Sequence, residues 1–177
     1  MKFKATHIPG LMVVLPTLIK DERGAFMEVF KASQYSRSGI KHAWEQENRS
    51  ISRQNVLRGM HYQVAPYAQA KLVGCIAGRL FDVAVDIRPG SPTYGKHFSI
   101  ELNPFDGEML YIPEGFAHGF YSMDNDTVMS YRCSKEYSPK HERGFIFDDI
   151  DVGIKWPAEY PIVSAKDALL PAFKEST

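Results

Sequence analysis

The spacing of proline and glycine limits the possible folds of this chain more than any other feature. Short apolar runs over residues 80–88, 97–102 and 109–112 are each followed by a turn that contains proline. Strand-length runs with turn residues about every 8 to 12 positions are typical of β-sandwiches and β-barrels. The sequence therefore predicts an all-β, antiparallel fold with a few short helices.

Residues 80–88 show the strand pattern most clearly. The odd-numbered positions from 81 to 87 are apolar and fall on one face of an extended segment, while Asp82 and Asp86 fall on the other. The apolar face is expected to be buried. The aspartates are either solvated or turned inward in a barrel that lines a ligand cavity, and the pattern leaves both alternatives open.

The N-terminal region is predicted to contain one strand and one short helix. Residues 25–30 alternate between apolar and polar side chains, which indicates a half-exposed strand. Residues 31–39 are compatible with a short helix that Ser33 could cap and Gly39 could end.

Length and charge set the outer limits. The 177 residues fit a single domain, 1–177, with residues 140–177 as a coil-rich tail packed on it. The 21 basic residues equal the 21 acidic ones, so no net field attracts nucleic acid or an anionic membrane. No run approaches the roughly 20 apolar residues of a membrane span. A soluble, cytoplasmic protein is therefore expected.

The two cysteines, Cys75 and Cys133, lie in apolar strand-like runs and lack the spacing of a metal site. We expect buried free thiols, with neither a disulfide nor a zinc site.

The residues best suited to chemistry in the central region are His61 and Lys71. The runs around them read as two strands joined by a turn, which would bring both side chains together across a hairpin ladder. A neutral histidine accepts a proton near pH 7, and a lysine stabilises the oxyanion that forms when a carbon beside a ketone is deprotonated. The pair suits proton abstraction, although a strand histidine is more often an ordinary hydrogen-bonded side chain.

Arg58 and His118 are candidates for the same site. Arg58 lies three positions before His61, so strict alternation puts them on opposite faces. Either Gly59 hosts a β-bulge or Arg58 lies at the mouth of the cavity, and we favour the mouth. His118 lies between two glycines, where a tight turn enters the next strand, and a histidine in such a position is often functional.

An ordered set of motifs extends over most of the chain. The motifs are Asp21-Glu22-Arg23-Gly24 with Phe26 and Glu28, Gln46-Glu47-Asn48, Val56-Leu57-Arg58-Gly59-Met60-His61-Tyr62-Gln63, Gln69-Ala70-Lys71, Pro113-Glu114-Gly115-Phe116-Ala117-His118-Gly119, Tyr131, Glu142-Arg143-Gly144 and Ser164-Ala165-Lys166-Asp167. Together they resemble the dTDP-4-dehydrorhamnose 3,5-epimerases, which are nucleotide-sugar epimerases. The resemblance implies a cupin-like, antiparallel jelly-roll barrel. It also implies cofactor-independent inversion of C3 and C5 of dTDP-4-dehydro-6-deoxy-D-glucose through an enolate.

The resemblance implies roles for individual residues. His61 would be the general base, Asp167 would orient it, Lys71 would face the enolate oxygen and Tyr131 would be the acid on the opposite face of the sugar. The implied substrate-binding residues are Arg23, Phe26, Glu28, Gln46, Glu47, Asn48, Arg58, His118, Tyr137, Glu142 and Lys166. Tyr137 either stacks on the nucleotide base or has only a surface or packing role. The family's Arg23 and Glu28 segment reaches a neighbouring subunit, so a homodimer is implied, with no metal.

Three alternatives stay open. One is a mono-epimerase that inverts only C3 or C5 of a related nucleotide-4-keto sugar. A metal-dependent cupin oxygenase would need two or three histidines and a carboxylate around the metal, whereas His61 and His118 each stand alone. A sugar-binding jelly roll without catalysis has no reason to combine His61, Lys71, Tyr131 and Asp167. The combination favours an enzyme, and the exact nucleotide and sugar are left open.

Overall fold

The computed structural model describes residues 1–176. The strands are β1 (Lys2–Ala5), β2 (Met12–Leu15), β3 (Leu18–Asp21), β4 (Gly24–Met27), β5 (Gln46–Ser52), β6 (Leu57–Gln63), β7 (Lys71–Ala77), β8 (Leu80–Asp86), β9 (His97–Leu102), β10 (Met109–Ile112), β11 (Phe116–Ser122), β12 (Thr127–Cys133) and β13 (Glu142–Gly144). The helices are α1 (Ala32–Arg37), the 3-10 helix η1 (Asp167–Leu169) and α2 (Phe173–Ser176). The prediction of an all-β chain with few short helices is confirmed. No helix among residues 1–176 has the length and apolarity needed to cross a membrane.

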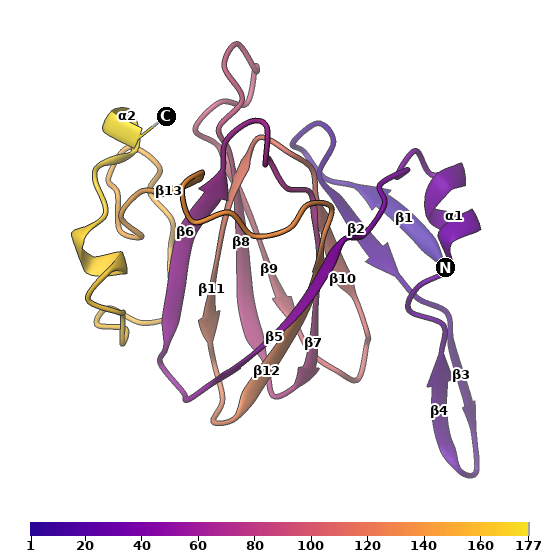
Figure 1. Cartoon of the computed structure of the whole chain (residues 1–177). Helices are drawn as coiled ribbons and strands as arrows, with labels where there is room; N and C mark the ends of the chain where they lie inside the picture. Colours follow the sequence, from indigo (N-terminus) through magenta and orange to yellow (C-terminus); the bar gives the residue numbers. More distant parts are fainter. Residues whose placement is uncertain (177) are drawn as a thin grey trace.

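Two antiparallel sheets pack face to face around one core (Figure 1). The first has six strands in the order β1-β2-β10-β7-β12-β5, and the second has five in the order β13-β6-β11-β8-β9. Val73 and Leu110 from the first sheet and Leu80 and Phe120 from the second belong to the same buried cluster. Removal of these apolar side chains from water is the main force that holds the sheets together. The predicted free thiols are also buried and unlinked.

Each sheet is covered on its outer face by a terminal part of the chain. Tyr35 of α1 packs in a cluster on the six-stranded sheet. Phe145 and Phe173 of the C-terminal segment pack with residues of β6 and β8 on the five-stranded sheet. This segment is drawn in orange and yellow at the left of Figure 1. The coil-rich tail therefore contributes to the buried interior and is not a loose extension.

The C-terminal segment that covers the five-stranded sheet explains why the outer face of β8 is apolar. Val83 and Val85 face the C-terminal segment, and Ala84 faces the space between the sheets. The predicted apolar face is therefore buried, as expected. Asp82 and Asp86 are both 0% exposed, so the inward alternative is correct and the solvated one is wrong.

Strands β6 and β7 belong to different sheets, so the predicted hairpin between them is wrong. β6 pairs with β11 and β13, whereas β7 pairs with β10 and β12. His61 and Lys71 therefore approach one another across the interior of the sandwich and not along a ladder. Alternation along a strand identifies the face of each side chain, but it does not identify the partner strand.

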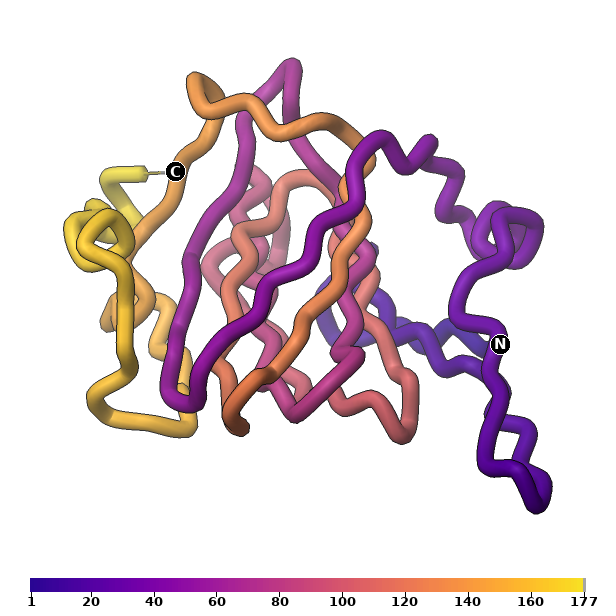
Figure 2. Tube along the Cα trace, turned by 60° about the horizontal axis from the view of Figure 1, so that its bottom comes forward, coloured from indigo at the N-terminus to yellow at the C-terminus, as the bar shows by residue number. Residues whose placement is uncertain are grey.

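The hairpin of β3 and β4 projects away from the sandwich, as Figures 1 and 2 both show. We call this hairpin the arm (residues 18–27). The strand ends at Met27 and not at residue 30, since Met27 pairs with Leu18, the first residue of β3.

The short helix predicted for residues 31–39 is confirmed over residues 32–37. Ser33 lies inside the helix, and the residue at the N-cap position, Lys31, makes no side-chain capping bond. The capping role predicted for Ser33 is therefore wrong. Gly39 follows the helix with a φ of +94°, which is the left-handed conformation that ends many helices.

Candidate active site

A bulge in β6 brings Arg58 and His61 to the same face of the sheet. His61 lies opposite His118 of β11 and Arg58 lies opposite Phe120, so one strand uses three steps where the other uses two. Gly59 has a φ of +132°, and a Cβ added to it would lie 2.6 Å from the backbone of β11. The bulge therefore explains why the two side chains share a face. Arg58 is exposed and lines the cavity, so its position also fits the mouth.

His61 forms a close pair with Asp167, at the start of η1. The imidazole Nε2 lies 3.0 Å from Asp167 Oδ1, and the Gly59 amide donates to Asp167 Oδ2 at 3.2 Å. Burial raises the pKa of Asp167, but the hydrogen bonds from His61 and Gly59 outweigh it and lower this pKa below its ordinary value. The carboxylate is therefore ionised near neutral pH. Because it engages Nε2, the nitrogen left to accept a proton is Nδ1.

A second histidine–aspartate pair lies beside the first. His118 Nε2 is 2.8 Å from Asp82 Oδ1, and both side chains are buried. His118 and His61 are direct neighbours on β11 and β6, so both imidazoles border the same space, and Asp82 supports His118 from behind. Sequence reasoning did not single out Asp82 as a site residue. The alternation of residues 80–88 is equally compatible with a solvated aspartate, so this pattern does not identify Asp82 as a site residue.

Lys71 and Tyr131 approach this space from the six-stranded sheet. Lys71 is the first residue of β7, and Tyr131 lies on the neighbouring strand β12, where it packs against the core between the sheets. Burial lowers the pKa of Lys71 and raises the pKa of Tyr131. The phenol therefore retains its proton at neutral pH. The negative charges of Asp82 and Glu142 act against the effect of burial on Lys71 and favour its charged form.

These side chains border one cavity of about 450 Å³ between the two sheets. Its lining includes Arg58, His61, Lys71, His118, Tyr131, Lys166 and Asp167. All four predicted catalytic residues and three of the predicted binding residues are therefore brought together. The tail closes the side next to β6, since Ile162 exchanges backbone hydrogen bonds with Asn55 and Leu57.

A second hollow of about 320 Å³ shares three of these lining residues, His61, Lys71 and Tyr131. Its other predicted binding residues are Gln46, Asn48, Tyr137 and Glu142. The Tyr137 hydroxyl donates to Glu142 at 2.8 Å, and Lys166 forms an ion pair with the same carboxylate. The two hollows thus form the ends of one groove, with the candidate catalytic side chains where they meet.

Four predicted binding residues lie elsewhere in the chain. Arg23 and Phe26 are on the arm, where Arg23 pairs with Asp21 and Phe26 is 66% exposed. Glu28 follows the arm and accepts a hydrogen bond from Gln34. Glu47 points to the outer face of β5, where it accepts a hydrogen bond from Arg132 at 3.1 Å. Within a single chain, none of the four lines the groove.

The two walls of the cavity carry side chains suited to proton transfer. A histidine on one wall can accept a proton from a bound molecule, and a tyrosine on the other wall can donate one to its opposite face. A cation beside them can stabilise negative charge on an oxygen. Residues 1–176 contain no group of three or more His, Cys, Asp or Glu side chains placed to hold a metal ion.

A family model and a known protein of similar sequence both point to the same family of epimerases. The family model for dTDP-4-dehydrorhamnose 3,5-epimerase matches residues 5–175. The chain is 44% identical to a dTDP-4-dehydrorhamnose 3,5-epimerase of Shigella flexneri over 163 residues, which cover 92% of this chain and 90% of that protein.

Two solved structures show the same fold. The dTDP-6-deoxy-D-glucose-3,5-epimerase of Legionella pneumophila, in complex with dTDP-4-keto-L-rhamnose, is 39% identical, with a TM-score of 0.93 over 98% of this chain and 93% of that one. The 3'-monoepimerase of Streptomyces bikiniensis, in complex with dTDP-quinovose, is 32% identical, with a TM-score of 0.89 over 96% and 86% of the two chains.

Proposed function

The chain belongs to the dTDP-4-dehydrorhamnose 3,5-epimerase family, and on this premise we propose how its own residues carry out the epimerisation. The substrate is dTDP-4-dehydro-6-deoxy-D-glucose and the product is dTDP-4-dehydro-L-rhamnose. The ketone at C4 acidifies the hydrogens on both of its neighbours, C3 and C5. Inversion of these two carbons needs only proton removal and return, so no electrons leave the sugar.

In the first half of each inversion, His61 removes the proton from the carbon next to the ketone. Nδ1 takes the proton, while Asp167 on Nε2 stabilises the imidazolium that forms. The electrons of the broken C–H bond move onto the C4 oxygen, which becomes an enolate. Lys71 stabilises that oxygen, because a cation held in place beforehand is complementary to the negative charge that develops there.

In the second half, Tyr131 returns a proton to the other face of the same carbon. The C4 ketone re-forms, and the carbon is inverted because the proton arrives on the side opposite to His61. His61 then carries an extra proton and Tyr131 lacks one, so exchange with water restores both. The observation that supports this scheme is the position of the His61–Asp167 pair and of Tyr131 on opposite walls of one cavity.

Deuterium incorporation from solvent tests this function directly. We expect the protein in D2O to place deuterium at both C3 and C5 of dTDP-4-dehydro-6-deoxy-D-glucose, as followed by NMR. The structural similarity to a 3'-monoepimerase makes single inversion the second candidate, and deuterium at only one carbon would establish it. Absence of exchange from a sugar that binds would refute the catalytic proposal.

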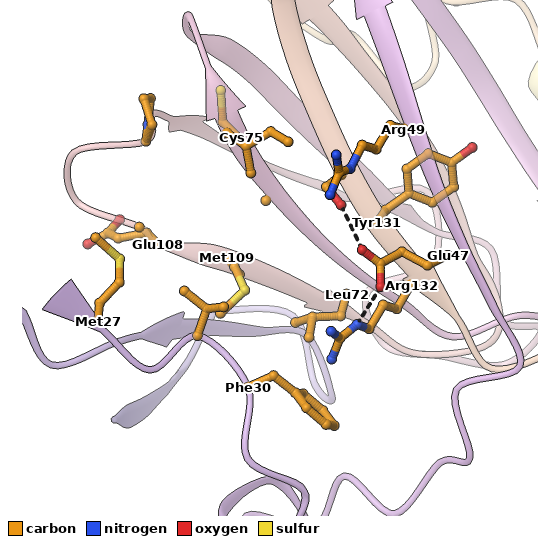
Figure 3. Close-up of a pocket in the computed structure, with 16 residues that line it drawn as sticks. Met27, Phe30, Glu47, Arg49, Leu72, Cys75, Glu108, Met109, Tyr131 and Arg132 are labelled. Atoms are coloured by element: carbon orange, nitrogen blue, oxygen red, sulfur yellow. Dashed lines mark hydrogen bonds and ion pairs between the residues drawn. The ribbon is translucent and has the colours of Figure 1, made fainter.

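We also propose that the protein acts as a homodimer in which the arm reaches the groove of the partner. Arg23, Phe26 and Glu28 lie on or beside the arm and do not reach the groove of their own chain. A hollow of about 380 Å³ at the base of the arm lies on the outer face of the six-stranded sheet (Figure 3). In Figure 3 the Tyr131 ring points away from Phe30 and Met109, so this hollow is behind the catalytic wall. A second copy on this face would place each arm near the other's groove.

Light scattering on the eluting protein tests the dimer. We expect a mass twice that of the 20.1 kDa chain at micromolar concentration. Phe26→Asp should lower the dimer fraction and the activity together, because a charge replaces an apolar side chain in the proposed interface. Ile150→Asp is the matched control, since Ile150 is 93% exposed in the C-terminal segment. A wild-type protein that is active and elutes as a monomer would contradict the proposal.

A further inference from the structure

One hydroxyl on the wall of the cavity has no hydrogen-bond partner. The inward face of β5 carries a row of polar side chains at every second position, namely Gln46, Asn48, Ser50 and Ser52. Gln46 donates to Asn48 at 2.8 Å, and Arg58 donates to Ser52 at 3.3 Å. The Oγ atom of Ser50 is buried and has no partner among residues 1–176. Ser50 is therefore the exception in an otherwise satisfied row.

The position of Ser50 indicates that its unpaired hydroxyl can bind a ligand. Ser50 lines the larger hollow together with Arg58, His118 and Tyr131. A buried hydroxyl without a partner destabilises the folded protein, because it has lost its bonds to water without replacement. An unpaired group of this kind in a binding cavity is satisfied when a ligand brings the missing partner.

We propose that Ser50 is a specificity-determining residue that forms a hydrogen bond with the C2 hydroxyl of the sugar. This inference rests on the proposed function and extends it. The sugar ring of the substrate carries hydroxyls at C2 and C3. The C3 hydroxyl changes position when its carbon is inverted, whereas C2 is not a reacting carbon and its hydroxyl can keep one contact throughout. Because Ser50 lies on a rigid strand, its hydroxyl suits a sugar hydroxyl that does not move during the reaction.

A structural role for Ser50 would have different consequences from a role in binding. Ser50→Ala removes an oxygen that makes no bond within the protein, so we expect the thermal midpoint of the free protein to be unchanged or higher. The same change should lower kcat/KM for the natural substrate. A serine that supported the fold would show the reverse, with a lower midpoint that accounts for any loss of activity.

The decisive experiment compares two substrates. We expect Ser50→Ala to lower kcat/KM by about 10- to 100-fold with dTDP-4-dehydro-6-deoxy-D-glucose. With the analogue that lacks the C2 hydroxyl, the wild type and the variant should have the same kcat/KM, since neither can form the bond. Ser99→Ala is the matched control. Ser99 is a partly buried serine on β9 that lines neither hollow, and its removal should not change either value.

Two results would overturn the assignment of Ser50. One is an unchanged kcat/KM in Ser50→Ala with the natural substrate, and the other is an equal loss with both substrates. The proposed function fails in a different way, namely if the wild type binds both sugars but exchanges no deuterium. In that event the dissociation constants of the two sugars still test the contact, because only the 2-hydroxy sugar should bind more weakly to Ser50→Ala.

Discussion

Replacement of His61 by asparagine is expected to stop deuterium exchange at both C3 and C5 while the nucleotide sugar still binds. Removal of the proposed base leaves the C–H bond without its proton acceptor. General acid–base groups typically contribute about 10²- to 10⁴-fold to a rate, so the loss should be at least of that size. NMR or mass spectrometry of the recovered sugar gives the measurement.

A matched variant separates the base from a general disturbance of the cavity. His118 lies directly across from His61 and has its own aspartate, Asp82, at 2.8 Å. We expect His118→Asn to weaken binding more than exchange, because the scheme gives His118 a binding role. Exchange at the wild-type rate in His61→Asn, together with loss of exchange in His118→Asn, would transfer the role of the base to His118.

Replacement of Tyr131 by phenylalanine is expected to separate proton removal from product formation. His61 and Lys71 remain, so the enolate still forms and returns to the starting sugar with deuterium from solvent. Without the phenol, no group on the opposite wall returns a proton, and the yield of inverted sugar should fall by about 10² or more. The expected result is a rate of deuterium exchange within a few-fold of the wild-type rate, with little inverted sugar formed.

The pH dependence of the wild type provides an independent test of the role of Tyr131. Burial raises the pKa of this phenol above its ordinary value of about 10. The donating form is therefore complete below that value and is lost only as the pH rises through the raised pKa. We expect no loss of epimerisation from this residue between pH 7 and pH 9.

The Tyr131→Phe variant also has a result that would contradict the assignment of Tyr131 as the acid. That result is an equal fall in the rate of deuterium exchange and in the rate of epimer formation.

The sequence by itself determined the class of fold and the location of several strands. Residues 97–102 and 109–112 were predicted as strands and are β9 and β10 with the same bounds. This works because proline and glycine limit each run and because alternation reports which side of a strand is buried. The ordered motifs also identified His61, Lys71, Tyr131 and Asp167, which all line one cavity in the structure. Recognition of a motif needs only the order of residues along the chain.

Only the tertiary structure decided how those residues meet. The sequence predicted that His61 and Lys71 face one another along a hairpin, whereas they approach across two sheets, because strand pairing depends on long-range packing. The bulge at Gly59 depends on the close passage of β11.

The same dependence on packing explains the two residues that sequence reasoning missed. Asp82 and Ser50 have local patterns that fit a solvated strand face equally well. Their burial depends on elements that are distant in sequence, since a second sheet covers the face on which they lie. Whether a polar side chain finds a partner is therefore decided by the assembled sandwich and not by its neighbours along the chain.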